Sequence, residues 1–139
     1  MGKALAIDFG LKRTGLAVTD DLRLIASGLE TVPTADLMSY LLDYVPKEKV
    51  DCFVVGQAIR MSGELSAIEQ NIVEFVKVLN LKFPGIRVVR QDERFTSKLA
   101  LDTMIKGGVK KKDRRNKNKG IIDMVSATLI LQSFLESQS

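Results

Sequence analysis

The first twenty residues constrain the fold of this chain more than any other stretch. A near-continuous apolar run ends in a carboxylate, Asp8, and a second apolar run leads to Asp20. An apolar run without polar alternation is typical of a central strand that is covered on both faces. Only a short polar turn, bracketed by Gly10 and Gly15, separates the two runs. Because such a turn closes a hairpin, the second strand is predicted to run antiparallel to the first.

Asp8 is the residue of this hairpin with two open interpretations. Aspartate is common in turns, where its side chain bonds the nearby backbone, so Asp8 can simply cap the turn. An ionised carboxylate is, however, costly to bury unless it is paired or binds a metal ion. The alternative is therefore that a buried strand delivers Asp8 to a metal or phosphate site.

The rest of the chain alternates between strand and helix patterns without an internal repeat, and a single domain over residues 1–139 is expected. The further strands are expected at residues 24–32, with a bulge at Ser27–Gly28, and at 50–56 and 86–90. The helices are expected from a Thr34 cap to Pro46, over 64–83, from Thr96 or Ser97 to Ile105, and over 120–135. The apolar stripe expected in the last helix is Ile121, Met124, Thr128, Leu131 and Leu135.

The chain contains no histidine and one cysteine, Cys52. This composition excludes Ser-His-Asp and Cys-His mechanisms and an ordinary zinc site. Any metal must be bound by oxygen ligands, which favours magnesium or manganese. Cys52 itself is expected to be a small core residue. Since no apolar run approaches the ~20 residues of a membrane span and no export signal is visible, the cytoplasm is the expected compartment.

Three carboxylates are expected to meet at one edge of the sheet. Asp8 ends the first strand, Glu93 follows the last strand, and Asp123 begins the last helix. Because three acids repel one another, their convergence predicts bound cations. Two divalent ions held in this way activate a water molecule and stabilise the leaving oxygen in phosphodiester cleavage. The plainer interpretation of Asp123 is that the helix dipole favours an acid in the first turn.

Basic residues are concentrated in residues 110–119, which hold seven of the 21 Lys and Arg residues and one acid. The net charge of this segment is +6, whereas that of the whole chain is +4, so the remaining residues together carry −2. Without apolar periodicity it is expected to be a mobile loop that binds a nucleic-acid backbone. The expected phosphate contacts are Lys12, Arg13, Arg60, Arg94, Lys110, Lys111, Lys112, Arg114, Arg115, Lys117 and Lys119. Arg60 can equally be an ordinary solvated loop residue.

Several motifs resemble those of the bacterial Holliday-junction-resolvase-like proteins known as pre-16S rRNA nucleases, over nearly the whole chain. They are Asp8-Phe9-Gly10, Lys12-Arg13-Thr14-Gly15, Val18-Thr19-Asp20, Val54-Val55-Gly56, Asp92-Glu93-Arg94-Phe95-Thr96, and Asp123 with Leu129-Ile130-Leu131-Gln132. The resemblance implies an α/β fold of ribonuclease-H-like type, with a mixed five-stranded sheet and helices on both faces. It implies a nuclease that uses magnesium or manganese, with two ions, and processes the 5′ end of precursor 16S rRNA during ribosome maturation. The metal-binding acids of the family fall on Asp8, Glu93 and Asp123.

The stretch Gln57–Gly63 departs from the family, which usually continues with Leu-Pro and an asparagine after the preceding strand. This departure affects substrate contacts and leaves the three acids in place. One alternative function is a DNA endonuclease that resolves four-way junctions, usually as a dimer, whereas this chain is expected to be a monomer or weak dimer. Another is a non-catalytic nucleic-acid-binding module. A sugar-kinase-like ATPase would need a second, duplicated domain, for which 139 residues leave no room.

Overall fold

The computed structural model describes residues 2–57, 67–92 and 119–138, and the described strands form one sheet in the order β3-β2-β1-β4-β5. The strands are β1 (Lys3–Asp8), β2 (Arg13–Thr19), β3 (Ala26–Pro33), β4 (Val50–Gln57) and β5 (Arg87–Asp92). The helices are the short 3-10 helix η1 (Thr34–Asp36), α1 (Leu37–Glu48), α2 (Glu69–Lys82) and α5 (Lys119–Gln138). β2 runs antiparallel to both β1 and β3, whereas β1, β4 and β5 are parallel.

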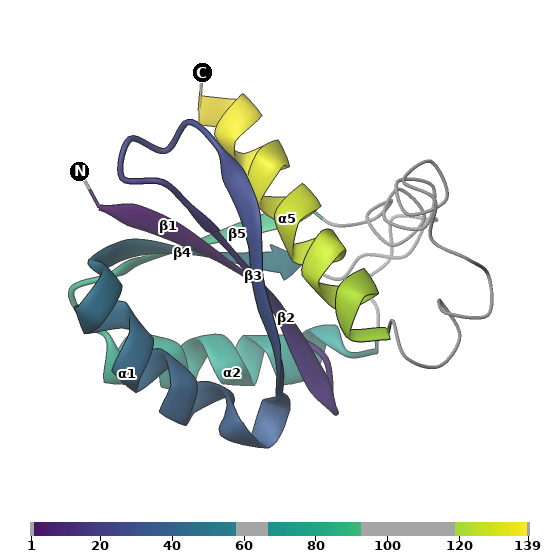
Figure 1. The fold of residues 1–139 in the computed structure, drawn as a ribbon. Helices are drawn as coiled ribbons and strands as arrows, with labels where there is room; N and C mark the ends of the chain where they lie inside the picture. The colour runs from purple at the N-terminus through teal and green to yellow at the C-terminus, as the bar shows by residue number, and fades with distance from the viewer. Residues whose placement is uncertain (1, 58–66, 93–118, 139) are drawn as a thin grey trace.

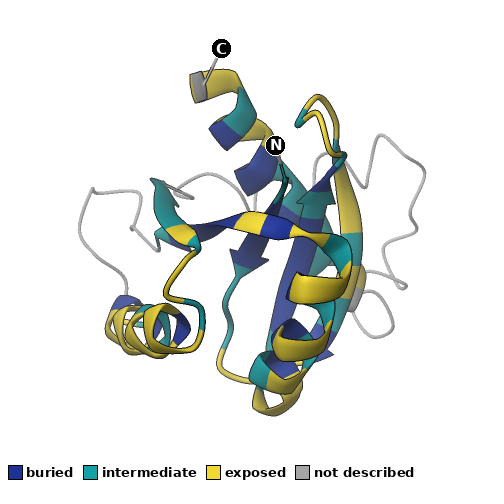
Figure 2. Ribbon diagram, turned by 90° about the vertical axis from the view of Figure 1, so that its left-hand side faces the viewer, coloured by how far each residue is buried: buried dark blue, intermediate teal, exposed yellow. Residues whose placement is uncertain are grey.

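Helices cover both faces of this sheet, with α1 and α2 on one side and α5 on the other (Figure 1). Figure 2 shows buried residues on the central strands and on the helix sides turned toward them. The predicted mixed five-stranded sheet with an antiparallel second strand is therefore confirmed. Among the described helices, none combines the length and apolar character that crossing a membrane requires.

The central strand β1 explains why its sequence is an unbroken apolar run. Leu5 and Ile7 belong to the core formed with α1 and α2, whereas Ala4 and Ala6 belong to the core formed with α5. All four are fully buried. Alternate residues of a strand point to opposite faces, so a strand covered on both faces offers no solvent-exposed position. The small side chains on the α5 side let that helix lie close to the sheet.

The sequence predicted that Pro46 ends the first helix, and this prediction is wrong. α1 continues through Pro46 to Glu48, and Lys49 then adopts a left-handed conformation (φ 57°), with its N–H bonded to the Val45 carbonyl. Proline lacks the N–H that would bond the carbonyl four residues earlier, and its ring crowds that carbonyl. That carbonyl belongs to Leu42, an exposed residue, so water can satisfy it. The left-handed residue, rather than the proline, ends the helix.

Other details of the elements also differ from the predictions: β3 begins at Ala26 rather than at residue 24, and β5 and α5 extend to Asp92 and Gln138. α2 begins at Glu69, because residues 67–68 form a turn rather than helix. Thr34 does not cap α1 but begins η1, without a capping hydrogen bond from its side chain. The bulge in β3 is confirmed, although its extra residue is Leu29, one position beyond the predicted pair. The helix expected to reach Ile105 lies outside the described residues.

The buried face of α5 is also different from the predicted stripe. The residues that form the core against the sheet are Ala127, Ile130, Leu131 and Phe134. Leu131 is shared with the prediction and Leu135 also packs against this core, but Ile121 is 39% exposed. Because this helix is apolar on several sides, its sequence is compatible with more than one stripe. The strands that the helix crosses select the face, and the small residues Ser126 and Ala127 are buried on it.

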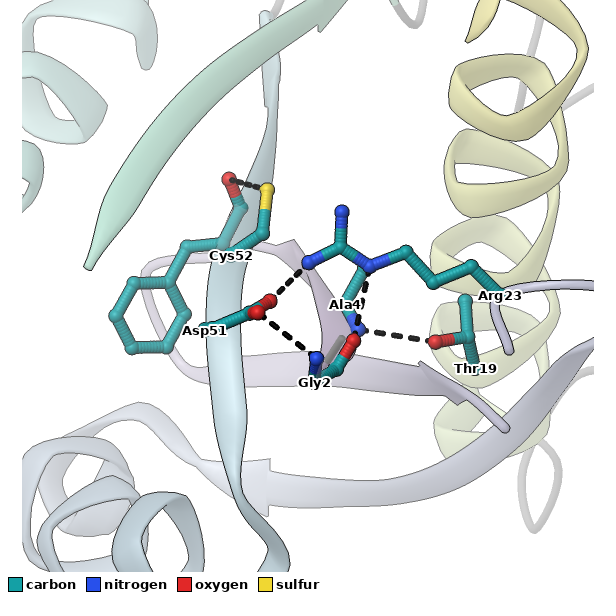
Figure 3. Close-up of polar contacts among 7 residues, drawn as sticks. Gly2, Ala4, Thr19, Arg23, Asp51 and Cys52 are labelled. Atoms are coloured by element: carbon teal, nitrogen blue, oxygen red, sulfur yellow. Dashed lines mark hydrogen bonds and ion pairs between the residues drawn. The ribbon is translucent and has the colours of Figure 1, made fainter. Parts of the chain in front are cut away.

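A cluster of polar contacts lies at the start of β1, at the end of the strand opposite Asp8 (Figure 3). Asp51 of β4 accepts a hydrogen bond of 2.9 Å from the Gly2 N–H and forms an ion pair with Arg23. Arg23 lies between β2 and β3, and its Nε donates to the Gly2 carbonyl at 2.9 Å. Together these contacts join the starts of β1 and β4 to the connection between β2 and β3.

We expect Thr19→Val to lower the free energy of unfolding by about 1–3 kcal/mol. The Thr19 hydroxyl accepts a buried hydrogen bond of 2.9 Å from the Ala4 N–H. Valine keeps the shape of threonine but leaves this N–H without a partner. Urea denaturation measures the loss, and Thr19→Ser, which retains the hydroxyl, should lose clearly less. Equal losses in both variants would mean that the hydroxyl contributes nothing.

Candidate metal and nucleic-acid site

The structure describes the side chains of four predicted site residues, which are Asp8, Lys12, Arg13 and Asp123. Lys119 begins α5, but its side chain is outside the described part of the chain. The other candidates lie outside the described residues; they are Arg60, Glu93, Arg94, Lys110, Lys111, Lys112, Arg114, Arg115 and Lys117. The metal-site hypothesis therefore depends on how the fold places two of its three acids.

Gly15 brings these two acids to the same place. It lies opposite Asp8 in the β1–β2 ladder, within β2 rather than at the end of the turn as the sequence suggested. On the helix side, a β-carbon at Gly15 would overlap the Asp123 carbonyl group and lie 3.0 Å from the Asp123 β-carbon. The backbone of α5 thus contacts the strand directly at the position beside Asp8. Only glycine permits so close an approach of helix and strand.

Both acids also face the same side of the sheet. Asp8 continues the alternation of Ala4 and Ala6, which pack against α5. Gly15, its cross-strand neighbour, points to that side as well, because it contacts Asp123. Asp8 and Asp123 therefore lie on the same face of the sheet near the end of β1, the face that α5 covers.

Asp123 is held by an ion pair with Arg13, in which the guanidinium Nε donates to Oδ2. Burial raises the pKa of the Asp123 carboxyl, and the Arg13 guanidinium partly offsets this shift. Asp123 lies beyond the first turn of α5, which contains no acid, so the helix-dipole interpretation is wrong. The carboxylate is instead placed where a cation must compensate its partial burial.

The hairpin between β1 and β2 forms one wall of a cavity of about 370 Å³ that Asp123 also lines. Its other lining residues include Lys12, which is exposed, and Arg13. The hairpin is anchored to η1, because the Thr34 N–H donates to the Lys12 carbonyl at 3.0 Å and its hydroxyl to the Gly10 carbonyl at 2.6 Å. Two cationic residues of this anchored loop thus line the same cavity as Asp123.

A second charged pair, which the sequence analysis did not identify, stabilises the same edge of the sheet. Arg90 of β5 binds both carboxylate oxygens of Glu69, at 3.0 and 2.6 Å. The same guanidinium donates to the carbonyls of Val55 and Gly56 at the end of β4, at 3.3 and 3.0 Å. Glu69 is only 5% exposed. These contacts hold the start of α2 against β4 and β5. Removing one partner of such a buried pair typically lowers the free energy of unfolding by about 3–5 kcal/mol.

The donors at this edge suit a hard divalent cation. Asp8 and Asp123 supply carboxylate oxygens, the preferred ligands of magnesium and manganese. The Asp123 position already accommodates positive charge, since it pairs with Arg13. Within residues 2–57, 67–92 and 119–138, no three potential ligands are grouped closely enough to hold a metal. The third predicted acid, Glu93, follows the last residue of β5 in the sequence.

The sequence contains one signal for the close packing at Gly15. A glycine inside a strand pattern often marks a close approach of another backbone. No comparable local signal points to Glu69 or Arg90, because 21 residues separate them in the chain. Their pairing depends on how α2 packs beside β5.

Comparison with known proteins places the whole chain in one family. The family model described as "RuvX: Holliday junction resolvase" matches residues 2–137. Relatives with the name "Putative pre-16S rRNA nuclease" include one from Phocaeicola vulgatus, 53% identical over 99% of this chain and 98% of the relative. Others are from Flavobacterium johnsoniae, 48% identical, and Bacteroides thetaiotaomicron, 49% identical, each covering 99% of both chains.

Solved structures with a similar fold come from more distant proteins. RuvC of T. thermophilus in complex with a Holliday junction substrate superposes with a TM-score of 0.57 at 19% identity, covering 100% of this chain and 97% of RuvC. The fowlpox virus resolvase superposes with a TM-score of 0.56 at 15% identity, covering 96% and 99%. At these identities the likeness establishes the shared ribonuclease-H-like fold. The family match over residues 2–137 and the relatives near 50% identity show that this chain belongs to the RuvX family of Holliday-junction-resolvase-like proteins.

Proposed function

We propose that this chain is a divalent-metal-dependent endonuclease that processes the 5′ end of precursor 16S rRNA in the cytoplasm. The observation that carries the proposal is the contact of Gly15 with Asp123, which sets two carboxylates at the end of β1. The substrate is inferred from the names of the relatives. We further propose that the chain acts as a single domain, as a monomer or weak dimer.

In this proposal Asp8 and Asp123, with Glu93, hold the metal ions. Bound divalent ions activate water and stabilise the leaving oxygen of a phosphodiester. The residues of the chain orient the substrate: Lys12 and Arg13, on the anchored hairpin, neutralise phosphate oxygens beside the acids. The basic residues at 110–119, together with Arg60 and Arg94, bind further phosphates along the RNA strand.

The decisive experiment compares three substrates with the purified protein and Mn²⁺. They are a 16S rRNA precursor, an unrelated linear RNA and a four-way DNA junction, and the Asp8→Asn variant controls for contaminating nucleases. We expect wild-type cleavage of the precursor near its 5′ processing site. Cleavage of the junction alone would instead favour the resolvase alternative, to which the family description and the RuvC complex point. Binding without cleavage of any substrate would favour a non-catalytic module.

We expect Arg13→Gln to increase the affinity for Mn²⁺ while decreasing the affinity for RNA. Removing the guanidinium beside Asp123 removes a competing positive charge, worth about 1 kcal/mol or roughly fivefold in affinity. The same change removes a proposed phosphate contact. Isothermal titration with Mn²⁺ and RNA-binding measurements provide the two readouts.

Lys12→Gln is the matched control for this prediction. Lys12 lies on the same hairpin and lines the same cavity as Arg13. The ion pair of Asp123 is with Arg13 rather than with Lys12. Lys12→Gln should therefore weaken RNA binding and leave the Mn²⁺ affinity nearly unchanged. An unchanged Mn²⁺ affinity in Arg13→Gln would argue that Asp123 is not a metal ligand.

A further inference from the structure

A second cavity, of about 330 Å³, lies on the other side of the sheet edge, between the start of α1 and the helix α2. Phe9, Phe75, Met38 and Val78 supply most of its apolar wall, and Asn71 and Glu74 supply polar groups. The residues from α2 stand at positions 71, 74, 75 and 78, which is one face of a helix. Its volume is near the lower limit of about 300 Å³ for ligand pockets, so it suits a small planar group.

This cavity adjoins the proposed metal site through consecutive residues. Asp8 faces α5, whereas Phe9 faces α2, where its ring packs on Phe75 at a centroid distance of 5.0 Å and an interplanar angle of 30°. Their α-carbons are only about 3.8 Å apart along the chain. Thr34 lines the cavity and also donates to the Gly10 carbonyl of the hairpin that carries Lys12 and Arg13. A substrate strand that crosses this edge can therefore contact both sites.

The chemistry of the lining matches a nucleobase. Bases stack on aromatic side chains, and single-stranded RNA is commonly recognised by bases turned out of the stack. The Asn71 amide offers both a donor and an acceptor for the edge of a base. Glu74 offers a further acceptor and is exposed, with Lys77 as a salt-bridge partner at 3.3 Å. The cavity thus combines apolar walls for the faces of a base with polar groups for its edge.

We propose that this cavity binds an unstacked base of the nucleic-acid substrate, from a nucleotide close to the scissile phosphate. The proposal rests on the proposed nuclease function and adds a specificity-determining site to it. In this arrangement the cationic hairpin and the acids hold the phosphate on the α5 side of the edge. The base reaches over the edge into the cavity beside Phe9 and Phe75.

Two valines of α2 provide a matched test. Val78 lines the cavity and is 41% exposed, whereas Val73 is 39% exposed and lies outside its lining. Val78→Trp fills the cavity, and Val73→Trp adds the same bulk to another side of the same helix. Asn71→Ala and Asn80→Ala form a second pair, because both residues are exposed and only Asn71 lines the cavity. Thermal melts verify that each variant is folded.

The measurement is the affinity for a single-stranded RNA oligomer that spans the 5′ processing site, with every variant also carrying Asp8→Asn to prevent cleavage. We expect Val78→Trp to weaken binding about tenfold, in line with the loss of one stacked base, and Val73→Trp to leave it unchanged. Asn71→Ala should weaken binding more than Asn80→Ala. An oligomer with one abasic nucleotide at the contacted position should bind the Asp8→Asn protein about tenfold more weakly and the Val78→Trp protein no more weakly than the intact oligomer.

Equal RNA affinities of Val78→Trp and Val73→Trp would overturn the base site. If Val78→Trp changed the oligomeric state of the protein but not its RNA affinity, the base site would also be overturned, and the cavity would instead bind a protein. These outcomes are separate from the nuclease hypothesis, because binding is measured without cleavage. If Val78→Trp binds RNA more weakly than Val73→Trp but the wild type cleaves no substrate, the base site is supported and the nuclease function is contradicted. If the wild type cleaves RNA but the two variants bind it equally, the nuclease function is supported and the base site is contradicted.

Discussion

Replacing Gly15 by alanine is expected to reduce cleavage at least about 100-fold, the loss typical when reacting groups move by an ångström. The added β-carbon overlaps the Asp123 carbonyl, which belongs to the backbone of α5 and cannot rotate away. The helix must therefore shift, and Asp123 moves relative to Asp8. Overpacking of this kind also costs about 1–3 kcal/mol of stability. Activity assays and melts with and without Mn²⁺ measure both effects, and we expect the Mn²⁺-induced stabilisation to be lost.

Gly28→Ala is the matched control. Gly28 lies on β3 under the same helix, but a β-carbon there meets the Met124 side chain, with Cγ at 2.8 Å and Sδ at 3.2 Å. A methionine side chain is flexible and can repack. Gly28→Ala should therefore retain most of the cleavage and of the response to Mn²⁺. If Gly15→Ala behaved like Gly28→Ala, the close approach at Gly15 would not position Asp123.

Asp8→Asn is expected to abolish cleavage and to remove most of the stabilisation by metal. An ion that binds only the folded state raises stability by mass action, by about 2.7 kcal/mol at 100 times its dissociation constant. Asparagine retains the shape of aspartate but loses the charge that holds a divalent ion. Melts of both proteins with Mn²⁺ and with chelator give the two shifts, and the wild type should show the larger one.

Without metal, Asp8→Asn should be at least as stable as the wild type. Removing one charge from a cluster of acids relieves repulsion of about 1 kcal/mol at most, and the pairing of Asp123 with Arg13 already relieves part of it. If Asp8 only capped the turn, asparagine would serve almost as well, because both residues cap backbone N–H groups. Equal Mn²⁺ shifts and surviving activity would therefore remove Asp8 from the metal site.

Local patterns in the sequence determined where the strands lie along the chain, the antiparallel hairpin and the class of metal ligands that the chain can offer. These follow from short-range physics: side-chain alternation sets strand burial, a short turn permits only a hairpin, and the lack of histidine leaves oxygen ligands. The position of Asp8 at the end of its strand was also visible, since it ends an apolar run. Glu93 and the basic segment stay predictions, because they lie outside the described residues.

Tertiary packing decided which side chains meet. Arg13 pairs with Asp123 across 110 residues of sequence, and the ring of Phe9, just after β1, packs against that of Phe75 on α2. No local pattern encodes such contacts, because they depend on the crossing of helices over the sheet. The face that α5 buries was predicted only in part for the same reason: a helix that is apolar on several sides turns toward the strands whose small residues allow the closest approach, and here that point is Gly15.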